Sequence, residues 1–178
     1  MKTAILAVCA LEDMEKTLWE TSASHLVSLI NEPMMPQTPS FIERPNHLKL
    51  SMNDIDSPVT GAILPSMAHV EQLIDFVKGW DQAHPLVIHC WAGISRSTAA
   101  AFITLCTLNP TLEERRLADL LRQKSPSATP NGRLVACADQ LLQRSGRMVE
   151  AIKAIGRGET ASLGPPFSIR AVFDEEAL

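Results

Sequence analysis

Residues 86–101 read L-V-I-H-C-W-A-G-I-S-R-S-T-A-A-A, and this stretch decides the fold of the chain. Its first four residues have strand character, a short loop with a glycine at position 93 follows, and its alanine-rich end has a high helix propensity. The order is therefore a strand, a tight loop and the N-terminus of a helix. The N–H groups of such a loop and of the first helical turn have no backbone partners, so the stretch predicts an anion-binding site.

Cys90 lies at the mouth of this predicted site, and Arg96 is the sixth residue after it. A thiol in this position is expected to ionise near neutral pH, because helix N-termini and nearby cations favour the thiolate. The planar guanidinium of Arg96 suits two phosphate oxygens at once. Ser97 can donate a hydrogen bond to the thiolate, and His89 can hydrogen-bond the loop backbone. We therefore predict attack by Cys90 on a phosphate monoester, with the phosphate held by Trp91, Ala92, Gly93, Ile94, Ser95 and Arg96.

Residues 89–97, H-C-W-A-G-I-S-R-S, resemble the H-C-x-x-G-x-x-R-[S/T] signature of the cysteine-based protein phosphatases, and the A-G-x-S-R-S form looks most like the dual-specificity subgroup. A bare C-x5-R pattern is common by chance, but here the strand, the preceding histidine, the glycine, the serine and the helix all accompany it. The resemblance is sharp over residues 86–101, moderate over 47–144 and poor at both ends of the chain. It implies a protein tyrosine or dual-specificity phosphatase that works through a cysteinyl-phosphate intermediate without a metal or cofactor.

A second catalytic group is needed because the leaving oxygen must be protonated. The family uses an aspartate on a loop upstream of the nucleophile, and the stretch from His47 to Asp54, H-L-K-L-S-M-N-D, looks like the strand that leads into this loop. The resemblance therefore favours Asp54 as the general acid, with Asp56 as its competitor. Both carboxylates could instead do no more than stabilise turns in an Asn/Asp/Ser-rich loop. Asn131 is expected either to steady the catalytic loop or to cap a helix.

The rest of the sequence alternates predicted strands and helices and then becomes helical, which indicates an α/β sandwich with a mostly parallel central sheet. We expect strands over residues 3–8, 25–30, 47–52 and 86–89, and helices over 12–20, 66–80, 97–108, 111–122, 133–144 and 147–155. Thr111 and Glu114 form a capping-box pattern for the fourth helix. Residues 1–158 are expected to form a single domain, and residues 159–178, with Gly-Pro-Pro and an acidic end, a C-terminal tail.

Composition narrows the classes of partner and compartment. Of the 178 residues, 46% are hydrophobic and 20% are charged, as expected for a globular domain. The net charge of −4 favours neither nucleic acid nor an anionic membrane as a partner, and no apolar segment approaches a membrane span. The short apolar run at the N-terminus is soon followed by acidic residues, which favours a buried strand over a signal peptide. The four cysteines show no metal-binding spacing, and a thiolate nucleophile suits the cytoplasm.

Several alternatives stay open at this point. No loop residue from Trp91 to Ser95 is basic, which in this family favours a phosphoprotein or a small phosphomonoester over a phosphoinositide. The sequence does not decide between phosphotyrosine and phosphoserine or phosphothreonine, nor does it give the oligomeric state. The rival interpretations are a catalytically weak module that binds a phosphorylated ligand, a phosphatase of a small non-protein monoester, and a sulfur-transfer or arsenate-reducing enzyme.

Overall fold

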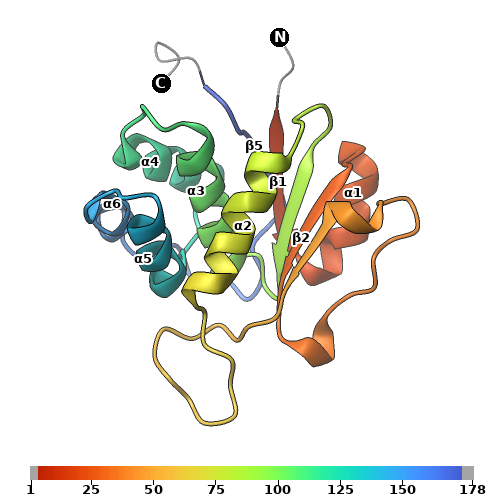
Figure 1. The fold of residues 1–178 in the computed structure, drawn as a ribbon, viewed down its shortest axis with the longest axis horizontal. Coiled ribbons are helices and arrows are strands. Elements are labelled where there is room, and N and C mark those ends of the chain that lie inside the picture. Colours follow the sequence, from red (N-terminus) through yellow and green to blue (C-terminus); the bar gives the residue numbers. More distant parts are fainter. Residues whose placement is uncertain (1–3, 174–178) are drawn as a thin grey trace.

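The computed structural model describes residues 4–173, which form one five-stranded sheet with helices on both faces (Figure 1). The strand order is β3-β2-β4-β1-β5, and the first four strands of this order run parallel. Their bounds are β3 His47–Leu50, β2 His25–Leu29, β4 Leu86–Cys90 and β1 Ile5–Ala10. The predicted mostly parallel sheet is therefore confirmed, and β4, which ends at Cys90, lies at its centre.

Helix α1, Met14–Thr21, packs on one face of the sheet, and the remaining helices cover the other face (Figure 1). These are α2 Met67–Gly79, α3 Arg96–Leu108, α4 Glu114–Lys124, α5 Gly132–Leu141 and α6 Arg147–Ile155. Three short 3-10 helices interrupt the loops: η1 Leu11–Asp13, η2 Glu32–Met34 and η3 Arg44–Asn46. All six predicted helices are present, including those of the helical C-terminal half.

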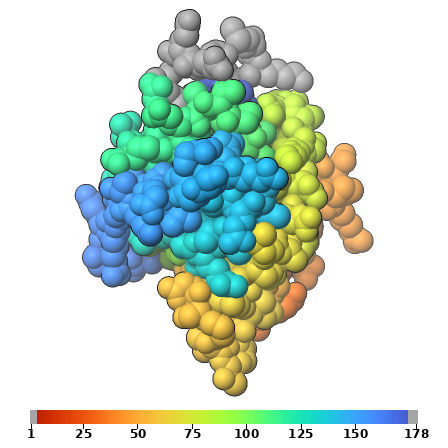
Figure 2. Space-filling model, turned by 60° about the vertical axis from the view of Figure 1, so that its left-hand side comes forward, coloured from red at the N-terminus to blue at the C-terminus, as the bar shows by residue number. Residues whose placement is uncertain are grey.

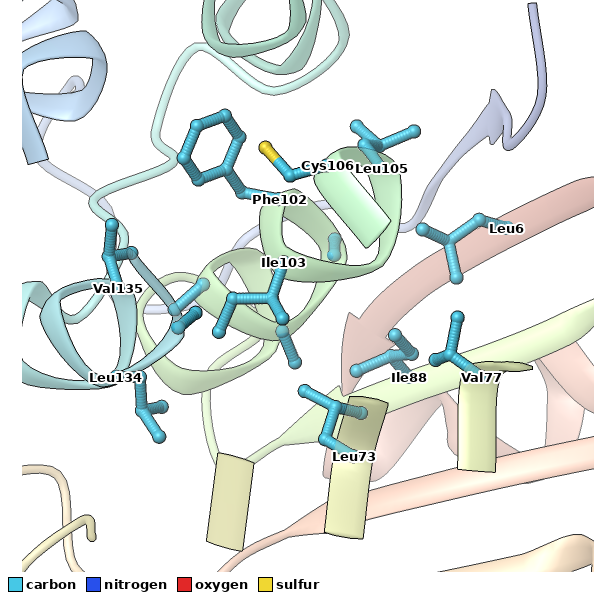
Figure 3. Close-up of a cluster of buried hydrophobic side chains, with 14 of the residues drawn as sticks. Leu6, Leu73, Val77, Ile88, Phe102, Ile103, Leu105, Cys106, Leu134 and Val135 are labelled. Atoms are coloured by element: carbon cyan, nitrogen blue, oxygen red, sulfur yellow. The ribbon is translucent and has the colours of Figure 1, made fainter. Parts of the chain in front are cut away.

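The strands place alternate side chains in two separate apolar clusters, as the period of two in a β-strand requires. On β1, Leu6 and Val8 join the large cluster under α2 and α3, while Ala7 and Cys9 join the small cluster under α1. Figure 3 shows the large cluster around Phe102 and Ile103. Helix α3 is buried along its length from Arg96 to Cys106, as its almost uniformly apolar sequence predicts.

The predicted capping box of the fourth helix is wrong. Helix α4 begins at Glu114, with Glu113 at its N-cap, and neither end of the Thr111–Glu114 pair makes the expected contact. The Glu114 side chain instead turns into the protein and forms ion pairs of 3.0 Å with Arg144 and Arg147. The ion pairs with Arg144 and Arg147, which follow α5 in the sequence, therefore hold the Glu114 side chain in place of the predicted capping box.

The prediction of a C-terminal tail over residues 159–178 is also wrong for the described part of that segment. Residues 167–170 form β5, Phe167–Arg170, which pairs antiparallel with β1. Ile169 and Ala171 are buried, and β5 covers an edge of β1 that would otherwise present unpaired backbone groups. Residues 174–178 lie outside the described part of the chain.

The parallel strands end at the lower side of the molecule in Figure 1, where the loop of residues 51–66 also projects. Figure 2 shows the same loop as the gold protrusion at the bottom of the molecule. This edge carries the strand ends where ligands bind in open α/β sheets. Among the described residues, no helix has the length and apolar character needed to span a bilayer.

Candidate active site

The loop from Cys90 to Arg96 is held by hydrogen bonds to its carbonyl groups from donors outside the loop. The Trp91 carbonyl accepts from the backbone N–H of Leu11, at 3.2 Å, and the Ala92 carbonyl from that of Gly164, at 2.8 Å. The Ile94 carbonyl accepts from the N–H of Thr129 at 2.9 Å, and the Ser95 carbonyl from that of Asn131 at 3.3 Å. The Cys90 carbonyl lies 3.3 Å from His89 Nδ1. Five carbonyls therefore point away from the centre of the loop.

This arrangement fixes the direction of the N–H groups. In a trans peptide the carbonyl of one residue and the N–H of the next point in opposite directions, and the chain has no cis peptide bond among residues 4–173. Turning the carbonyls outward therefore turns the N–H groups of residues 92, 93, 95 and 96 inward. None of these N–H groups has a hydrogen-bond acceptor among the described residues. The loop is a cradle of free donors, as the sequence predicts.

Gly93 is required where the loop approaches β1. Its φ is +72°, and a Cβ at this position would lie 2.8 Å from both the Ala10 nitrogen and the Cys9 carbonyl carbon. Any other residue would meet both a strained backbone and a steric clash. The glycine therefore keeps the loop against the carboxyl end of β1.

Cys90 and Ser97 meet at the floor of the cradle. The Cys90 Sγ lies 3.1 Å from the Ser97 Oγ, and both side chains are buried, with Cys90 only 1% exposed. Ser97 stands in the first turn of α3, so the serine and the positive end of the helix face the same sulfur. This is the contact expected for a hydroxyl that stabilises a thiolate.

Arg96 is buried but keeps part of its guanidinium free. Its Nη1 donates to the Met52 carbonyl at 2.8 Å, which ties the arginine to the segment leading to Asp54. Its Nε is buried and has no partner among residues 4–173. An unpaired buried donor on a charged group is costly, and a bound oxyanion would satisfy it.

Asp54 is hydrogen-bonded to the loop, whereas Asp56 is not. Asp54 Oδ1 accepts hydrogen bonds from Ser95 Oγ, at 2.7 Å, and from Asn131 Nδ2, at 2.9 Å. Among the described residues, Asp56 accepts only from its neighbour Ser57, at 2.9 Å. Asn131 also caps α5 by accepting from the Leu134 N–H, so both roles considered for it in the sequence are present.

His89 is fully buried on the α1 side of β4, next to Cys90. Its Nδ1 contacts the Cys90 carbonyl, as expected, and its Nε2 lies 2.6 Å from Ser28 Oγ. Burial lowers the pKa of His89 to about 4, and the charge of Arg96 acts in the same direction, against the hydrogen bond to Cys90. The imidazole is therefore neutral at physiological pH and presents one donor and one acceptor.

Comparison with known proteins identifies the architecture. No family model matches the chain, and no curated protein matches it in sequence. Among solved structures, DUSP15 superposes with a TM-score of 0.61 at 19% identity, over 90% of this chain and 97% of its own. Human DUSP28 gives 0.60 at 17% identity, over 79% and 89%. The human tyrosine phosphatase-like serine/threonine/tyrosine-interacting protein gives 0.58 at 16%, over 76% and 87%.

The fold is that of the dual-specificity phosphatases. Because one of these neighbours is named as a phosphatase-like interacting protein, the fold by itself does not decide catalysis. That question rests on the residues of the loop and on Asp54.

In this phosphatase fold, two hollows flank the loop of residues 90–96 and meet at Ser95, Thr129 and Pro130. One, of about 420 Å³, is lined by the 54–59 segment and the start of α5. The other, of about 540 Å³, lies between the loop, α6 and residues 156–161, and contains Lys153 and Arg157. A third, of about 180 Å³, is apolar and includes Trp91, which is 51% exposed. The three hollows around the loop therefore differ in the residues that line them, so each would contact a different part of a bound molecule.

The residues that hold the 90–96 loop from distant parts of the chain were not identified from the sequence. Gly164 belongs to the expected tail, and no local signal points to its contact with Ala92. Ser28 has a signal in the sequence, because it is the only polar residue within the apolar run L-V-S-L-I of residues 26–30. Such a buried hydroxyl needs a partner, which the structure supplies as His89.

Proposed function

We propose that this protein is a phosphate monoester hydrolase of the protein tyrosine and dual-specificity type, acting through a cysteinyl-phosphate intermediate. The observation that carries the proposal is the cradle of inward N–H groups around Cys90, completed by the unpartnered Nε of Arg96. These donors match the equatorial oxygens of a phosphoryl group in transfer. The nucleophile, the arginine and the aspartate all occur together, which a purely phosphate-binding module does not require.

The first step transfers the phosphoryl group to sulfur. The Cys90 thiolate attacks phosphorus, a P–S bond forms, and the bond to the leaving oxygen breaks. Asp54 in its acid form gives its proton to that oxygen, so the product leaves as an alcohol or phenol. Asp54 Oδ1 is occupied by Ser95 and Asn131, whereas Oδ2 has no partner among residues 4–173 and is free to carry this proton.

The second step releases phosphate. The Asp54 carboxylate takes a proton from water, the water oxygen attacks phosphorus, and the P–S bond breaks to regenerate the thiolate. Ser97 Oγ, 3.1 Å from the sulfur, donates to the departing thiolate and makes it a better leaving group. No step draws on a metal or an organic cofactor.

A phosphorylated protein is the substrate we favour over a small monoester. Two hollows on adjoining sides of Ser95 leave room for the chain on either side of a phosphorylated residue. Loop residues 91–95 carry no positive charge, which disfavours a polyanionic headgroup. The reaction needs Cys90 reduced, so we place the protein in a reducing compartment such as the cytoplasm.

Turnover of p-nitrophenyl phosphate by the purified protein tests the proposal. We expect hydrolysis that vanadate inhibits competitively and that Cys90→Ser abolishes, while Cys90→Ser keeps its affinity for phosphopeptides because the cradle and Arg96 remain. Phosphotyrosine and phosphothreonine peptides then compare the two substrate types. Phosphopeptide binding by the wild type without turnover would instead support a binding module.

A further inference from the structure

A continuous chain of hydrogen-bonded side chains runs across the α1 face of the sheet to the catalytic loop. Thr38 Oγ1 lies 2.9 Å from His47 Nδ1, and His47 Nε2 lies 2.8 Å from Ser28 Oγ. Ser28 Oγ lies 2.6 Å from His89 Nε2, and His89 Nδ1 reaches the Cys90 carbonyl at 3.3 Å. The chain crosses β3, β2 and β4, three neighbouring strands, and links the 31–46 loop to the nucleophile.

Only one assignment of hydrogens satisfies every contact. The Cys90 carbonyl can only accept, so His89 Nδ1 carries the hydrogen and His89 Nε2 accepts the one hydrogen of Ser28. Ser28 Oγ must then accept from His47 Nε2, which leaves His47 Nδ1 to accept from Thr38. Both imidazoles must be neutral for this order, and burial lowers the pKa of each to about 4.

We propose that Ser28, His47 and Thr38 are positioning residues that hold His89 in its Nδ1–H tautomer and so keep the Cys90 carbonyl turned out of the phosphate cradle. The consequence for a bound oxyanion is direct, because the Trp91 N–H belongs to the same peptide as that carbonyl. The proposal rests on the proposed function for its catalytic consequence, but the tautomer of His89 can be measured without turnover.

The surroundings argue for a specific role of this polar chain. The buried part of the same face carries an apolar cluster, which includes Cys9, Leu26 and Val87. A buried polar group stabilises a protein little even when it is paired, and costs free energy when it is not. Apolar side chains would be sufficient for packing at these positions. The row of hydrogen-bonded side chains instead ends at the Cys90 carbonyl, which favours a role in holding the catalytic loop.

The test compares four variants of the hydrogen-bonded chain and one control variant with the wild type, at a temperature where urea titrations show each to be folded. Ser28→Ala, His47→Leu and Thr38→Val break the chain at successive links. We expect kcat for p-nitrophenyl phosphate to fall most in Ser28→Ala, by roughly tenfold or more, and progressively less at the two more distant links. His47→Gln should stay near the wild type, because its amide nitrogen can donate to Ser28 and its oxygen can accept from Thr38.

Ser24→Ala is the matched control, because Ser24 Oγ makes a similar 2.8 Å contact with His25 Nδ1 at the opposite end of β2. Nitrogen-15 NMR of the imidazoles should show His89 protonated at Nδ1 in the wild type and Ser24→Ala, with altered His89 signals in Ser28→Ala. Vanadate affinity should fall together with kcat. If the wild type shows no turnover, the His89 signals and vanadate binding still test the chain.

An Nε2–H tautomer of His89 in the wild type would overturn the proposal. Equal kcat and vanadate affinity in Ser28→Ala and Ser24→Ala would also overturn it, because a purely structural role predicts lower stability alone. A loss of kcat in His47→Gln as large as that in His47→Leu would contradict the assigned direction of the hydrogen bonds.

Discussion

Asp54 and Asp56 stand two residues apart, and their side chains have different surroundings. Asp54 shares its Oδ1 between Ser95 and Asn131, while Asp56 has only Ser57 as a hydrogen-bond partner among residues 4–173. The proposed role of Asp54 as the acid depends on these contacts, which engage Oδ1 and leave Oδ2 without a partner in the same part of the chain. An exchange of carboxylate for amide keeps the acceptor oxygen and removes the transferable proton.

We therefore expect Asp54→Asn to lower kcat by about 100-fold for alkyl phosphates and by less for esters of acidic phenols. The basic limb of the pH–kcat profile should also flatten. A series of substrates that differ in leaving-group pKa measures this effect. Asp56→Asn is the control and should leave leaving-group dependence unchanged. A reversed result for the two variants would assign the acid to Asp56.

The role of Arg96, like that of Asp54, depends on the contacts of its own side chain. Its Nη1 is committed to the Met52 carbonyl, while its Nε has no partner among residues 4–173 and is free to donate to an anion. Arg96→Lys keeps the charge but cannot make both sets of contacts. We expect kcat/KM to fall by about 100-fold or more in steady-state assays. A loss below about tenfold, or about 1.4 kcal/mol, would mean that Arg96 does not hold the phosphate.

At the scale of elements, the segment between α6 and β5 supports the loop of residues 90–96. A Cβ on Gly164 would lie 2.9 Å from the Gly93 carbonyl oxygen and 3.2 Å from Ile94 Cγ1. Gly164→Ala must therefore move either the loop or its own segment. We expect kcat/KM to fall by roughly tenfold. Gly79→Ala is the control, since its Cβ would meet no atom within 4 Å. Equal activity of both variants would show that this segment does not position the loop.

Glu114 joins α4 to the chain beyond α5. Its carboxylate is 5% exposed and pairs with Arg144, which is 10% exposed, and with the more exposed Arg147. Burial tends to raise the pKa of Glu114, but the hydrogen bond and charge of Arg147 and the charge of Arg144 together lower it. The stabilisation is therefore present above the unfolded pKa of about 4.3 and is lost as pH falls through the lower folded value.

Glu114→Gln leaves Arg144 buried without a counter-charge, so we expect the free energy of unfolding at pH 7 to fall by about 3 kcal/mol. The difference from the wild type should shrink in acid. Urea denaturation at pH 7 and pH 4 measures both effects. Glu150→Gln, which breaks an exposed pair with Lys153, should cost less than about 1 kcal/mol. A similar cost for the two variants would contradict a buried role for Glu114.

At the scale of the whole molecule, two buried histidines make stability depend on pH. Burial lowers the pKa of His47 and of His89 to about 4, from the ordinary 6.5. Between these values the unfolded chain binds protons that the folded protein does not. Stability should therefore be greatest above about pH 6.5 and decline as pH falls toward 4.

Urea midpoints measured from pH 7.5 to pH 4.5 should show this decline. His47→Gln removes one of these groups, so its midpoint should decline less than that of the wild type over the same range. His84→Gln is a control at an exposed position and should follow the wild type. A wild-type midpoint that is constant between pH 7.5 and 5 would show that neither histidine is held neutral by folding.

The parts of the molecule that depend on adjacent residues could be predicted from the sequence. The strand, loop and helix of residues 86–101 follow from local propensity and from the unpaired N–H groups of a helix start. The mostly parallel sheet, the six helices and the buried α3 follow from apolar periodicity. The approach of Asp54 to the loop was also expected, although only through the family resemblance.

Tertiary structure alone decided the features that depend on pairing across long separations. Residues 167–170 form a strand only because β1 offers an open edge. The Glu114 side chain does not form the expected capping box, because Arg144 and Arg147 lie within ion-pair distance of it. His47 and His89 both reach Ser28 because the parallel strands β3, β2 and β4 bring these three side chains to the same face of the sheet. A single sequence shows local preference but not which distant group will satisfy a buried polar atom, and that choice is made by the packing of the sheet.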